Sequence, residues 1–595
     1  MKILSARRVR ACAAIACSVA CSAAARAQPA RVPVRVPVRV PVPPDATVAS
    51  RTDEYLTRLE SLGYAGGVLV LHDGKTVLEK SYGYANRDAG IRADTGTVYS
   101  LGSITKQFTA AAILRLEELG KLHTTDSIAK FFSGVPADKR GITLHMLLTH
   151  TSGLESDFSP TDYEPTTRDE YVRRALASTL RTPPGREHFY ANAGYSLLAA
   201  VIEIVTGEEY EAALTGLVLR PAGMLETGYT APHWPAARVA HGYQGGRDWG
   251  TSVARLSEPG APYWELRGNG GLQTTLGDMQ RWDEAQNTRV VLTDSSRRKY
   301  VQPYVNEDAS GQSQYAYGWV VMRTARGTRL ITHNGGNGVF VAEFLRFVDE
   351  GVTIFLTSTV AELPASPVAR TLEHIAFGEP YELPPKKVTV TAAALRAMTG
   401  TYRAPDGSTL ALRVEGDRLL ADPAGELAYL LTVTGDTVAS PRAAAANAKS
   451  DAIVAALVRG DVGPLHDALD DAPDSAELGR QERGMMADRK DRWGAYRSFA
   501  VLGSVQLPRG PVQTTVRIDF ERGTATNIYV WNAAGRIVDV GARPYQSGEL
   551  IPVGAGEFRS YNIRSGGGMR VRAEGVGAVA ALLIETPRGV VRLVR

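Results

Sequence analysis

The chain has 595 residues, which is too long for one domain of usual size, so about two to four domains are expected. Hydrophobic residues make up 44% of the sequence and charged residues 22%, as in an ordinary globular protein, which excludes a chain built mainly from polar low-complexity sequence. The formal net charge is +4, and only three cysteines are present.

The first 27 residues have the features of a secretory signal peptide. Basic residues near the start precede an Ala-rich apolar stretch, and Ala25-Arg26-Ala27 forms a small-x-small cleavage pattern before Gln28. Arg7-Arg8 is a weak indication of twin-arginine export, and Cys21 is a weak indication of lipidation. We therefore expect an exported protein that is periplasmic or secreted.

Removal of this signal peptide changes what the composition allows. All three cysteines lie within it, so the mature chain has no thiolate nucleophile, no disulfide framework and no zinc–thiolate site. The segment carries five basic residues and no acidic one, so the net charge falls from +4 to −1 and gives no case for nucleic-acid binding. No later stretch reaches about 18 apolar residues, so no transmembrane span is expected in the mature chain.

Residues 28–48 repeat Arg-Val-Pro-Val and predict a stiff linker, because proline at this density blocks helix and sheet. A folded domain is expected over residues 49–380, where strand patterns at both ends enclose helical periodicity. This arrangement predicts an α/β or α+β domain with a mixed sheet flanked by helices. The expected elements are strands at 68–71, 76–80, 339–347 and 352–357, and helices at 103–119 and 195–205.

Ser103 and Lys106 are the first candidates for chemistry. Acyl transfer needs a nucleophile, a base and an oxyanion hole. The two residues are three apart at the start of a predicted helix, which places their side chains on one face and near the positive end of the helix dipole. Burial would lower the pKa of the lysine so that it could accept a proton. The chain contains Ser-x-x-Lys three times, so any single match is more often structural than catalytic.

The order of several motifs gives these residues more weight. The successive segments are 101–109 around Ser103, 142–154, Tyr190-Ala191-Asn192, Gly270-Gly271-Leu272 and His333-Asn334-Gly335-Gly336. In this order they resemble the serine β-lactamase and penicillin-binding-protein superfamily, which includes class C β-lactamases, D-alanyl-D-alanine carboxypeptidases and related esterases. The resemblance covers about residues 50–378.

The resemblance implies a role for each matching residue near the nucleophile. It makes Ser103 the nucleophile and Lys106 the group that accepts its proton or keeps the network charged. Tyr190 would act as a general base or acid. Asn192 would orient Lys106 and the substrate. The substrate would be a small molecule or a peptide.

The third motif supplies the opposite wall, with His333 lining it and Gly335 and Gly336 letting the strand backbone approach the substrate closely. Backbone N–H groups of Ser103 and Gly336 would form the oxyanion hole. Class C β-lactamases usually have Lys-Thr-Gly here, and a histidine carries a positive charge only when protonated. This departure moves the resemblance toward esterases and peptidases and away from strong β-lactamase activity.

Other catalytic templates are missing from the sequence, including the Gly-x-Ser-x-Gly elbow, the Walker loop, the dinucleotide fingerprint and His-Glu-x-x-His. The ten histidines are scattered, so neither a metal site nor a cofactor is expected. His145 and His150 are interpreted as packing or hydrogen-bonding residues.

The last third of the chain predicts two further modules. Residues 388–440 resemble the small β-domain that often follows such hydrolases, and residues 546–595 would supply its missing strands. The intervening residues 445–541 would then be an inserted α+β module that resembles the nuclear-transport-factor-2 type. Its helix is expected over residues 453–469.

The sequence therefore predicts an exported serine hydrolase that cleaves an ester or amide bond. Two alternatives are a D-alanyl-D-alanine carboxypeptidase or β-lactamase, and a non-catalytic penicillin-binding sensor or scaffold. The sequence leaves the oligomeric state and the acyl and leaving groups open.

Overall fold

The computed structural model describes residues 42–159, 161–258, 263–308, 310–470, 472, 475–506, 511–545, 547–563, 568–575 and 579–595. The predicted signal peptide and most of the predicted linker lie outside these residues. The described chain forms two compact units, of which the first ends at Tyr381 and the second begins at Glu382. None of the described helices is both long and apolar enough to cross a membrane.

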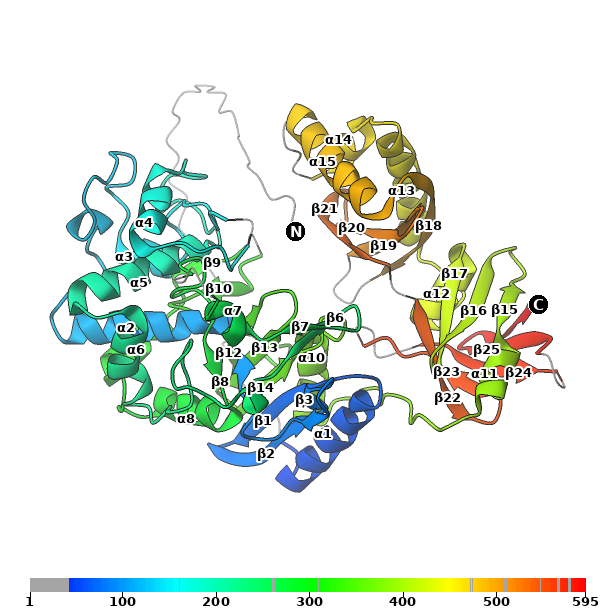
Figure 1. The fold of residues 1–595 in the computed structure, drawn as a ribbon, viewed down its shortest axis with the longest axis horizontal. Coiled ribbons are helices and arrows are strands. Elements are labelled where there is room, and N and C mark those ends of the chain that lie inside the picture. The colour runs from blue at the N-terminus through cyan, green and yellow to red at the C-terminus, as the bar shows by residue number, and fades with distance from the viewer. Residues whose placement is uncertain are drawn as a thin grey trace, which may run out of the picture. The chain divides into compact units, whose positions relative to one another are not determined.

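The first unit is built on an eight-stranded sheet with the order β2-β1-β14-β13-β12-β11-β10-β9 (Figure 1). The predicted sheet flanked by helices is present, and each neighbouring pair in it is antiparallel. Short connections account for the pairs from β9 to β14 and for β1 with β2, whereas β1 and β14 pair from distant parts of the chain. The strands are β1 (Gly66–His72), β2 (Lys75–Tyr82), β9 (Val305–Asn306), β10 (Ser313–Tyr315), β11 (Val320–Arg323), β12 (Arg329–Gly336), β13 (Val341–Phe347) and β14 (Val352–Ser358).

The predicted first hairpin is confirmed as β1 and β2. Asp73 and Gly74 both have positive φ, 48° and 76°, which is the backbone that a tight hairpin turn requires. Every residue of β14 is buried, so helices cover both faces of the sheet at its centre. Helix α1 (Asp45–Glu60) packs on β2, α10 (Ala365–Ala376) on β13 and β14, and α8 (Leu276–Asn287) on β1 and β14. Since α1 begins at Asp45, the predicted linker ends earlier than residue 48.

Helix α2 (Thr105–Glu118) runs through the middle of the helical part of this unit, and its first ten residues are all buried. The aromatic rings of Phe108 and Trp282 stack on one another with centroids 4.3 Å apart. The buried amide of Gln107 accepts a hydrogen bond from Trp282 Nε1 at 2.9 Å. This bond satisfies the Gln107 amide oxygen, although its buried Nε2 has no hydrogen-bond partner among the described residues.

Within the described residues this unit has further helices and helical turns. They are η1 (Gly102–Ile104), η2 (Ile128–Lys130), α3 (Leu144–Leu148), α4 (Arg168–Ala177), α5 (Asn192–Thr206), α6 (Tyr210–Leu214), η3 (Thr215–Leu219), η4 (Ala236–Arg238), α7 (Ser252–Leu256) and α9 (Asp294–Tyr300). Short two-stranded pairs join β3 (Tyr84–Asn86) to β4 (Ile91–Arg92), β5 (Tyr99–Ser100) to β8 (Gln273–Thr274), and β6 (Gly242–Gln244) to β7 (Arg247–Gly250).

The second unit contains a closed barrel whose strands come from two separate parts of the chain. The barrel closes where Arg403 pairs with Val594. Its strands are β15 (Gly400–Arg403), β16 (Thr409–Glu415), β17 (Arg418–Ala424), β22 (Gly548–Gly554), β23 (Glu557–Arg559), β24 (Arg570–Glu574), β25 (Ala581–Thr586) and β26 (Gly589–Val594), and two helices accompany it, α11 (Ala392–Met398) and α12 (Glu426–Thr434).

An α+β module lies between β17 and β22 in the chain. Its sheet has the antiparallel order β18-β19-β20-β21. The predicted helix over residues 453–469 is wrong in its bounds, because Gly460 has φ +84° and separates two helices. The elements are α13 (Pro441–Val458), α14 (Gly463–Ala468), α15 (Ser475–Trp493), β18 (Tyr496–Gln506), β19 (Val512–Phe520), β20 (Thr524–Trp531) and β21 (Ile537–Pro544).

Candidate active site

Ser103 lies in the short turn η1, immediately before α2, with its side chain half-buried. Strand β12 crosses this turn closely enough that only glycine fits at the contact. A Cβ on Gly335 would meet the Leu101 carbonyl oxygen at 2.0 Å and the Ser103 backbone nitrogen at 2.6 Å. Gly102, on the other side, has φ +51° and would meet the Gly336 nitrogen at 2.3 Å. The glycines therefore hold β12 directly against the nucleophile turn.

The Lys106 amine is the centre of the site's hydrogen bonding. Its Nζ donates to Ser103 Oγ at 3.1 Å, to Asn192 Oδ1 at 2.7 Å and to the Asn269 carbonyl oxygen at 2.9 Å. The side chain is fully buried. Three contacts fix the amine next to the serine oxygen. When Lys106 is neutral, its two hydrogens serve Asn192 and Asn269 and its lone pair faces the Ser103 hydroxyl.

Burial determines the proton affinity of this amine. It lowers the pKa of Lys106 to about 7, although Asp157 and Asp162 raise it by their negative charge. Loss of solvation disfavours the charged form of a lysine, and no carboxylate in direct contact offsets that loss. A large fraction of Lys106 is therefore a neutral amine near pH 7. A base at this position must be neutral, and the sequence alone could not show that it is.

Tyr190 and Asn192 flank the start of α5 and face Lys106. Lys106 Nζ lies 4.7 Å from the Tyr190 ring centroid. Burial raises the pKa of Tyr190, and the Ser103 side chain partly offsets the increase. The tyrosine is therefore a neutral phenol at neutral pH. Asn192 accepts from Lys106 with its oxygen and donates from Nδ2 to Asp157 Oδ1 at 2.8 Å, which fixes the orientation of its amide.

His333 is buried on β12, and its ring centroid lies 6.3 Å from that of Tyr190. Burial, with the nearby Lys106, lowers the pKa of His333 to about 3, so the ring is neutral. Its Nδ1 is 2.6 Å from the Asn334 carbonyl oxygen, which can only accept, so Nδ1 carries the hydrogen. Nε2 then accepts from the Tyr315 hydroxyl at 3.0 Å. This wall of the site therefore has no permanent positive charge.

The buried His150 packs against the Tyr190 ring. His150 has φ +55°, and its Nδ1 accepts the Ala191 backbone N–H at 3.1 Å. Its ring centroid is 4.2 Å from that of Tyr190 and 4.7 Å from that of Tyr315. Burial and the neighbouring Lys106 lower the pKa of His150 well below its usual value. These contacts agree with its interpretation as a packing and hydrogen-bonding residue.

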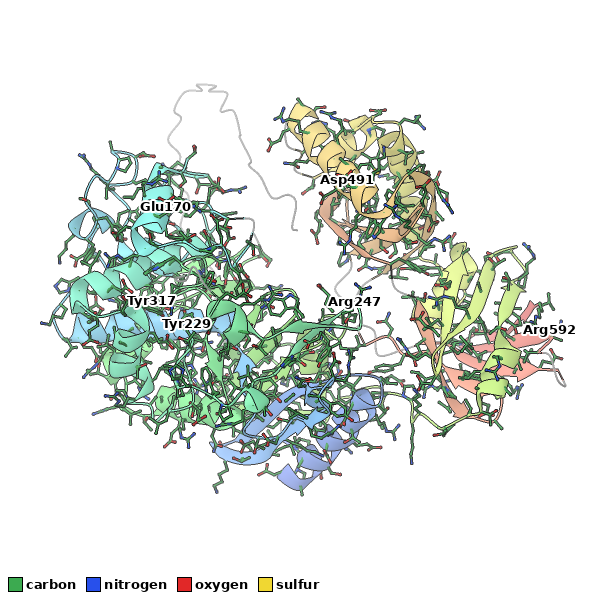
Figure 2. All side chains as sticks on the ribbon, in the orientation of Figure 1. Glu170, Tyr229, Arg247, Tyr317, Asp491 and Arg592 are labelled. Carbon is green, nitrogen blue, oxygen red and sulfur yellow. The ribbon has the colours of Figure 1, made fainter. Side chains whose placement is uncertain are left out.

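The glycine-rich segment that ends at Leu272 is attached to α2 and to a buried tyrosine. Thr109 Oγ1 donates to the Gly268 carbonyl oxygen at 2.6 Å, and the Leu272 N–H donates to Thr105 Oγ1 at 3.2 Å. The Gly268 N–H donates to the hydroxyl of Tyr229, which is labelled in Figure 2, at 3.0 Å. These bonds hold the Asn269 carbonyl against Lys106. The sequence did not indicate Asn269 itself, only the adjacent Gly270-Gly271.

The structure brings together all seven residues that the motifs indicated, and it accounts for the competing Ser-x-x-Lys matches. Ser127 caps η2, accepting the Ala129 N–H, while Lys130 pairs with Asp126. In the third match, Lys299 pairs with Glu117 at 2.7 Å. The charged ammonium groups of these two lysines are partnered by carboxylates. Among these three lysines of the described chain, Lys106 is the one that hydrogen-bonds the serine of its own motif.

Residues outside this cluster do not suggest a metal centre. No group of His, Cys, Asp and Glu within the described ranges could hold a metal ion. His145, the other histidine of the second motif segment, instead contacts the hydroxyl of Tyr317, also labelled in Figure 2, at 2.7 Å.

A family model described as Beta-lactamase matches residues 51–376. The chain belongs to the beta-lactamase family. Penicillin-binding protein 4* of Bacillus subtilis is 27% identical over 408 residues, which cover 64% of this chain and 89% of that protein. Protein flp of Staphylococcus aureus is 27% identical over 321 residues, which cover 52% of this chain and 61% of that protein.

A solved structure shows the same fold as this beta-lactamase-family chain. The octameric penicillin-binding protein homologue from Pyrococcus abyssi has a TM-score of 0.51 and 18% identity, over 92% of this chain and 99% of that one. The predicted superfamily and fold are therefore confirmed. Family membership also places the chain among serine hydrolases in the general sense.

Proposed function

We propose that this protein is an exported serine hydrolase that cleaves an ester or amide bond through an acyl-enzyme on Ser103. The observation that carries the proposal is the 3.1 Å hydrogen bond from Lys106 Nζ to Ser103 Oγ. The amine is buried, and its pKa is about 7. Such an amine can exist as a base at the pH at which the enzyme works. The export part rests on the predicted signal peptide, residues 1–27.

In the acylation step, neutral Lys106 accepts the Ser103 hydroxyl proton while Oγ attacks the carbonyl carbon of the substrate. Negative charge then develops on the carbonyl oxygen. The backbone N–H groups of Ser103 and Gly336 would donate to this oxygen, since β12 lies directly against the nucleophile turn. Removing one donor of this kind typically lowers kcat by about 10² to 10³.

The leaving group needs a proton, and Tyr190 is suited to deliver it. Burial raises its pKa, so its phenol is a donor and not a phenolate. Tyr190 would pass its proton to the leaving oxygen or nitrogen and regain one from the Lys106 ammonium. A water molecule then attacks the acyl carbon and gives a proton to Lys106. The bond from Ser103 Oγ to the acyl carbon breaks, Lys106 returns the proton to Oγ, and the acid product leaves.

The neutral His333 favours substrates without a carboxylate at this wall. In Lys-Thr-Gly enzymes of the family a lysine would supply a permanent positive charge, whereas the pKa of His333 is about 3. A carboxylate would meet no charge complement from this side chain at neutral pH. This observation favours esters and uncharged amides over penicillin-type substrates.

The second candidate is a D-alanyl-D-alanine carboxypeptidase or β-lactamase. Similarity to Penicillin-binding protein 4* along 89% of that protein's length favours it. A non-catalytic sensor is the third candidate. The complete set of Ser103, Lys106 and Tyr190 argues against a scaffold without acyl-transfer chemistry. A sensor that only becomes acylated would use the same Ser103–Lys106 pair, so turnover separates it from an enzyme.

The test is turnover of p-nitrophenyl esters, nitrocefin and D-alanyl peptides by the mature protein and by Ser103→Ala. We expect ester or amide turnover that falls by several orders of magnitude in Ser103→Ala. Turnover of nitrocefin or D-alanyl peptides without ester turnover would favour the second candidate. Turnover that survives in Ser103→Ala would refute the nucleophile, and no turnover with stoichiometric penicillin labelling would favour the sensor.

A further inference from the structure

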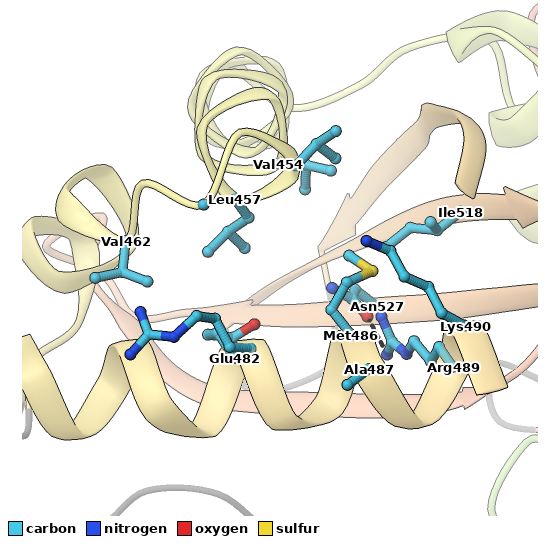
Figure 3. A pocket seen from close by; sticks show the side chains of 13 residues that line it. Val454, Leu457, Val462, Glu482, Met486, Ala487, Arg489, Lys490, Ile518 and Asn527 are labelled. Carbon is cyan, nitrogen blue, oxygen red and sulfur yellow. Dashed lines mark hydrogen bonds between the residues drawn. The ribbon is translucent and has the colours of Figure 1, made fainter. Parts of the chain in front are cut away.

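The α+β module contains a cavity of about 230 Å³ that is separate from the Ser103 site (Figure 3). It lies between α13, the α13–α14 connection, α15 and strands β19 and β20. In Figure 3, Met486 and Lys490 extend from α15 toward the side on which Val454 and Leu457 of α13 lie. Its lining residues are Val454, Leu457, Val458, Gly460, Val462, Glu482, Arg483, Met486, Ala487, Arg489, Lys490, Ile518 and Asn527.

Most of the wall is apolar. Val454, Leu457 and Val458 come from the last turn of α13, Met486 from the middle of α15, and Ile518 from β19. Methionine and branched aliphatic side chains adapt to an apolar ligand and provide no hydrogen bonds. These residues can therefore hold the hydrocarbon part of a ligand but cannot orient it.

A buried guanidinium provides the orienting group. Arg489 is only 7% exposed, although arginine is rarely buried without a partner. Its Nη2 donates to Asn527 Oδ1 at 2.7 Å, the dashed line in Figure 3. Burial lowers the pKa of Arg489, but arginine begins so high that it remains a cation. A guanidinium has five N–H donors in a planar fork, which matches a carboxylate.

The other charges around the cavity leave it positive. Arg483 and Lys490 also line it and are exposed at its rim. Glu482 is the one acidic lining residue, and it lies seven residues before Arg489, about 10 Å away along α15. Burial raises the pKa of Glu482, and the charges of Glu482 and Arg489 act on each other across the cavity. Three basic residues against one acidic residue give a small anion a charge complement at the Arg489 end of the cavity.

We propose that this cavity binds a small apolar carboxylate, with its carboxylate on the Arg489 guanidinium and its hydrocarbon part between Val454, Leu457 and Met486. Dry cavities of about 150 Å³ accommodate benzene, so 230 Å³ has room for one ring and a short carboxylate arm. The site gives this non-catalytic module a ligand-binding role that does not depend on the chemistry at Ser103.

The test measures binding of phenylacetate and of its neutral isostere phenylacetamide to the full-length mature protein by calorimetry and ligand-observed NMR. A ligand this small is expected to bind with a Kd of about 1 mM or below. We expect phenylacetate to bind about tenfold more tightly than phenylacetamide. Arg489→Met should remove this preference, whereas Arg489→Lys, which keeps the charge, should retain part of it.

A second variant tests the cavity without touching its charges. Val458→Trp adds a large side chain to the cavity wall and should abolish binding of both ligands. All three variants should keep wild-type ester turnover, and Ser103→Ala should bind phenylacetate like the wild type, which separates this site from the catalytic one. The proposal is overturned if the wild type binds neither ligand at about 10 mM, if it binds both equally, or if Val458→Trp leaves binding unchanged.

Discussion

The pH dependence of acylation follows from the protonation of Lys106, and Asn192→Asp should shift it in a known direction. With a pKa of about 7, roughly half of Lys106 is a neutral base at pH 7 and about 1% at pH 5. The wild-type kcat/KM should rise about tenfold per pH unit below pH 7 and level off above it. Asn192 Oδ1 lies 2.7 Å from Nζ, so a carboxylate there would stabilise the ammonium.

An opposite charge at contact distance raises a lysine pKa by about one to three units, so Asn192→Asp should lower kcat/KM at pH 7 by about 5- to 500-fold. The loss should shrink to about twofold or less by pH 10, where at least about half of Lys106 is neutral in both proteins. The assay is p-nitrophenyl ester hydrolysis from pH 5 to 10, with Ser103→Ala as the blank at each pH. A wild-type rate that falls as the pH rises above 7, or an acid limb at the same pH in both proteins, would refute the role of Lys106 as base.

Three further results are expected. Tyr190→Phe should lower kcat by about 10² to 10⁴ while leaving the acid limb near pH 7, because it removes the proton donor and not the base; an unchanged kcat in ester hydrolysis would show that another group protonates the leaving atom. His333→Gln should reduce the loss of folding stability on acidification. The folded pKa of His333, about 3, lies below the unfolded value, so His333 removes up to about 1.4 kcal/mol of stability per pH unit as pH falls from about 6.5 to 3. Urea titrations of both proteins at pH 7 and 5 that show equal losses would contradict this. Gly335→Ala should abolish activity and lower Tm by several degrees, since its Cβ would lie 2.0 Å from the Leu101 oxygen. Gly336→Ala should lower Tm less, because its nearest contact would be at 3.0 Å. Equal Tm values for the two variants would argue against the close crossing of β12.

Local patterns in the sequence predicted the parts of the fold that local physics determines. The first hairpin was predictable because its turn residues adopt positive φ readily. Helix α2 was predictable from its Ala-rich apolar periodicity. By contrast, residues 441–450 gave no apolar period, so the start of α13 was missed, although the Ser440 side chain caps it by accepting the Ala443 N–H. The break at Gly460 was hidden by apolar residues on both sides.

In the active site, too, local contacts were predictable from the sequence and long-range contacts were not. The i, i+3 spacing alone places Ser103 and Lys106 on one face, whereas the roles of Asn192 and His333 came from the order of motifs. Tyr315 was not found, because it reaches His333 across the intervening strand β11 and no local pattern encodes that contact. The neutrality of Lys106 and His333 also depends on burial by residues far away in the sequence.

The most direct test of the account is the mass of the protein after reaction with a fluorophosphonate and with a slowly hydrolysed ester. The account predicts a single covalent adduct, located on Ser103 by peptide mapping, that forms faster as pH rises through about 7 and is missing in Ser103→Ala. An adduct on another residue, or full ester turnover by Ser103→Ala, would contradict it.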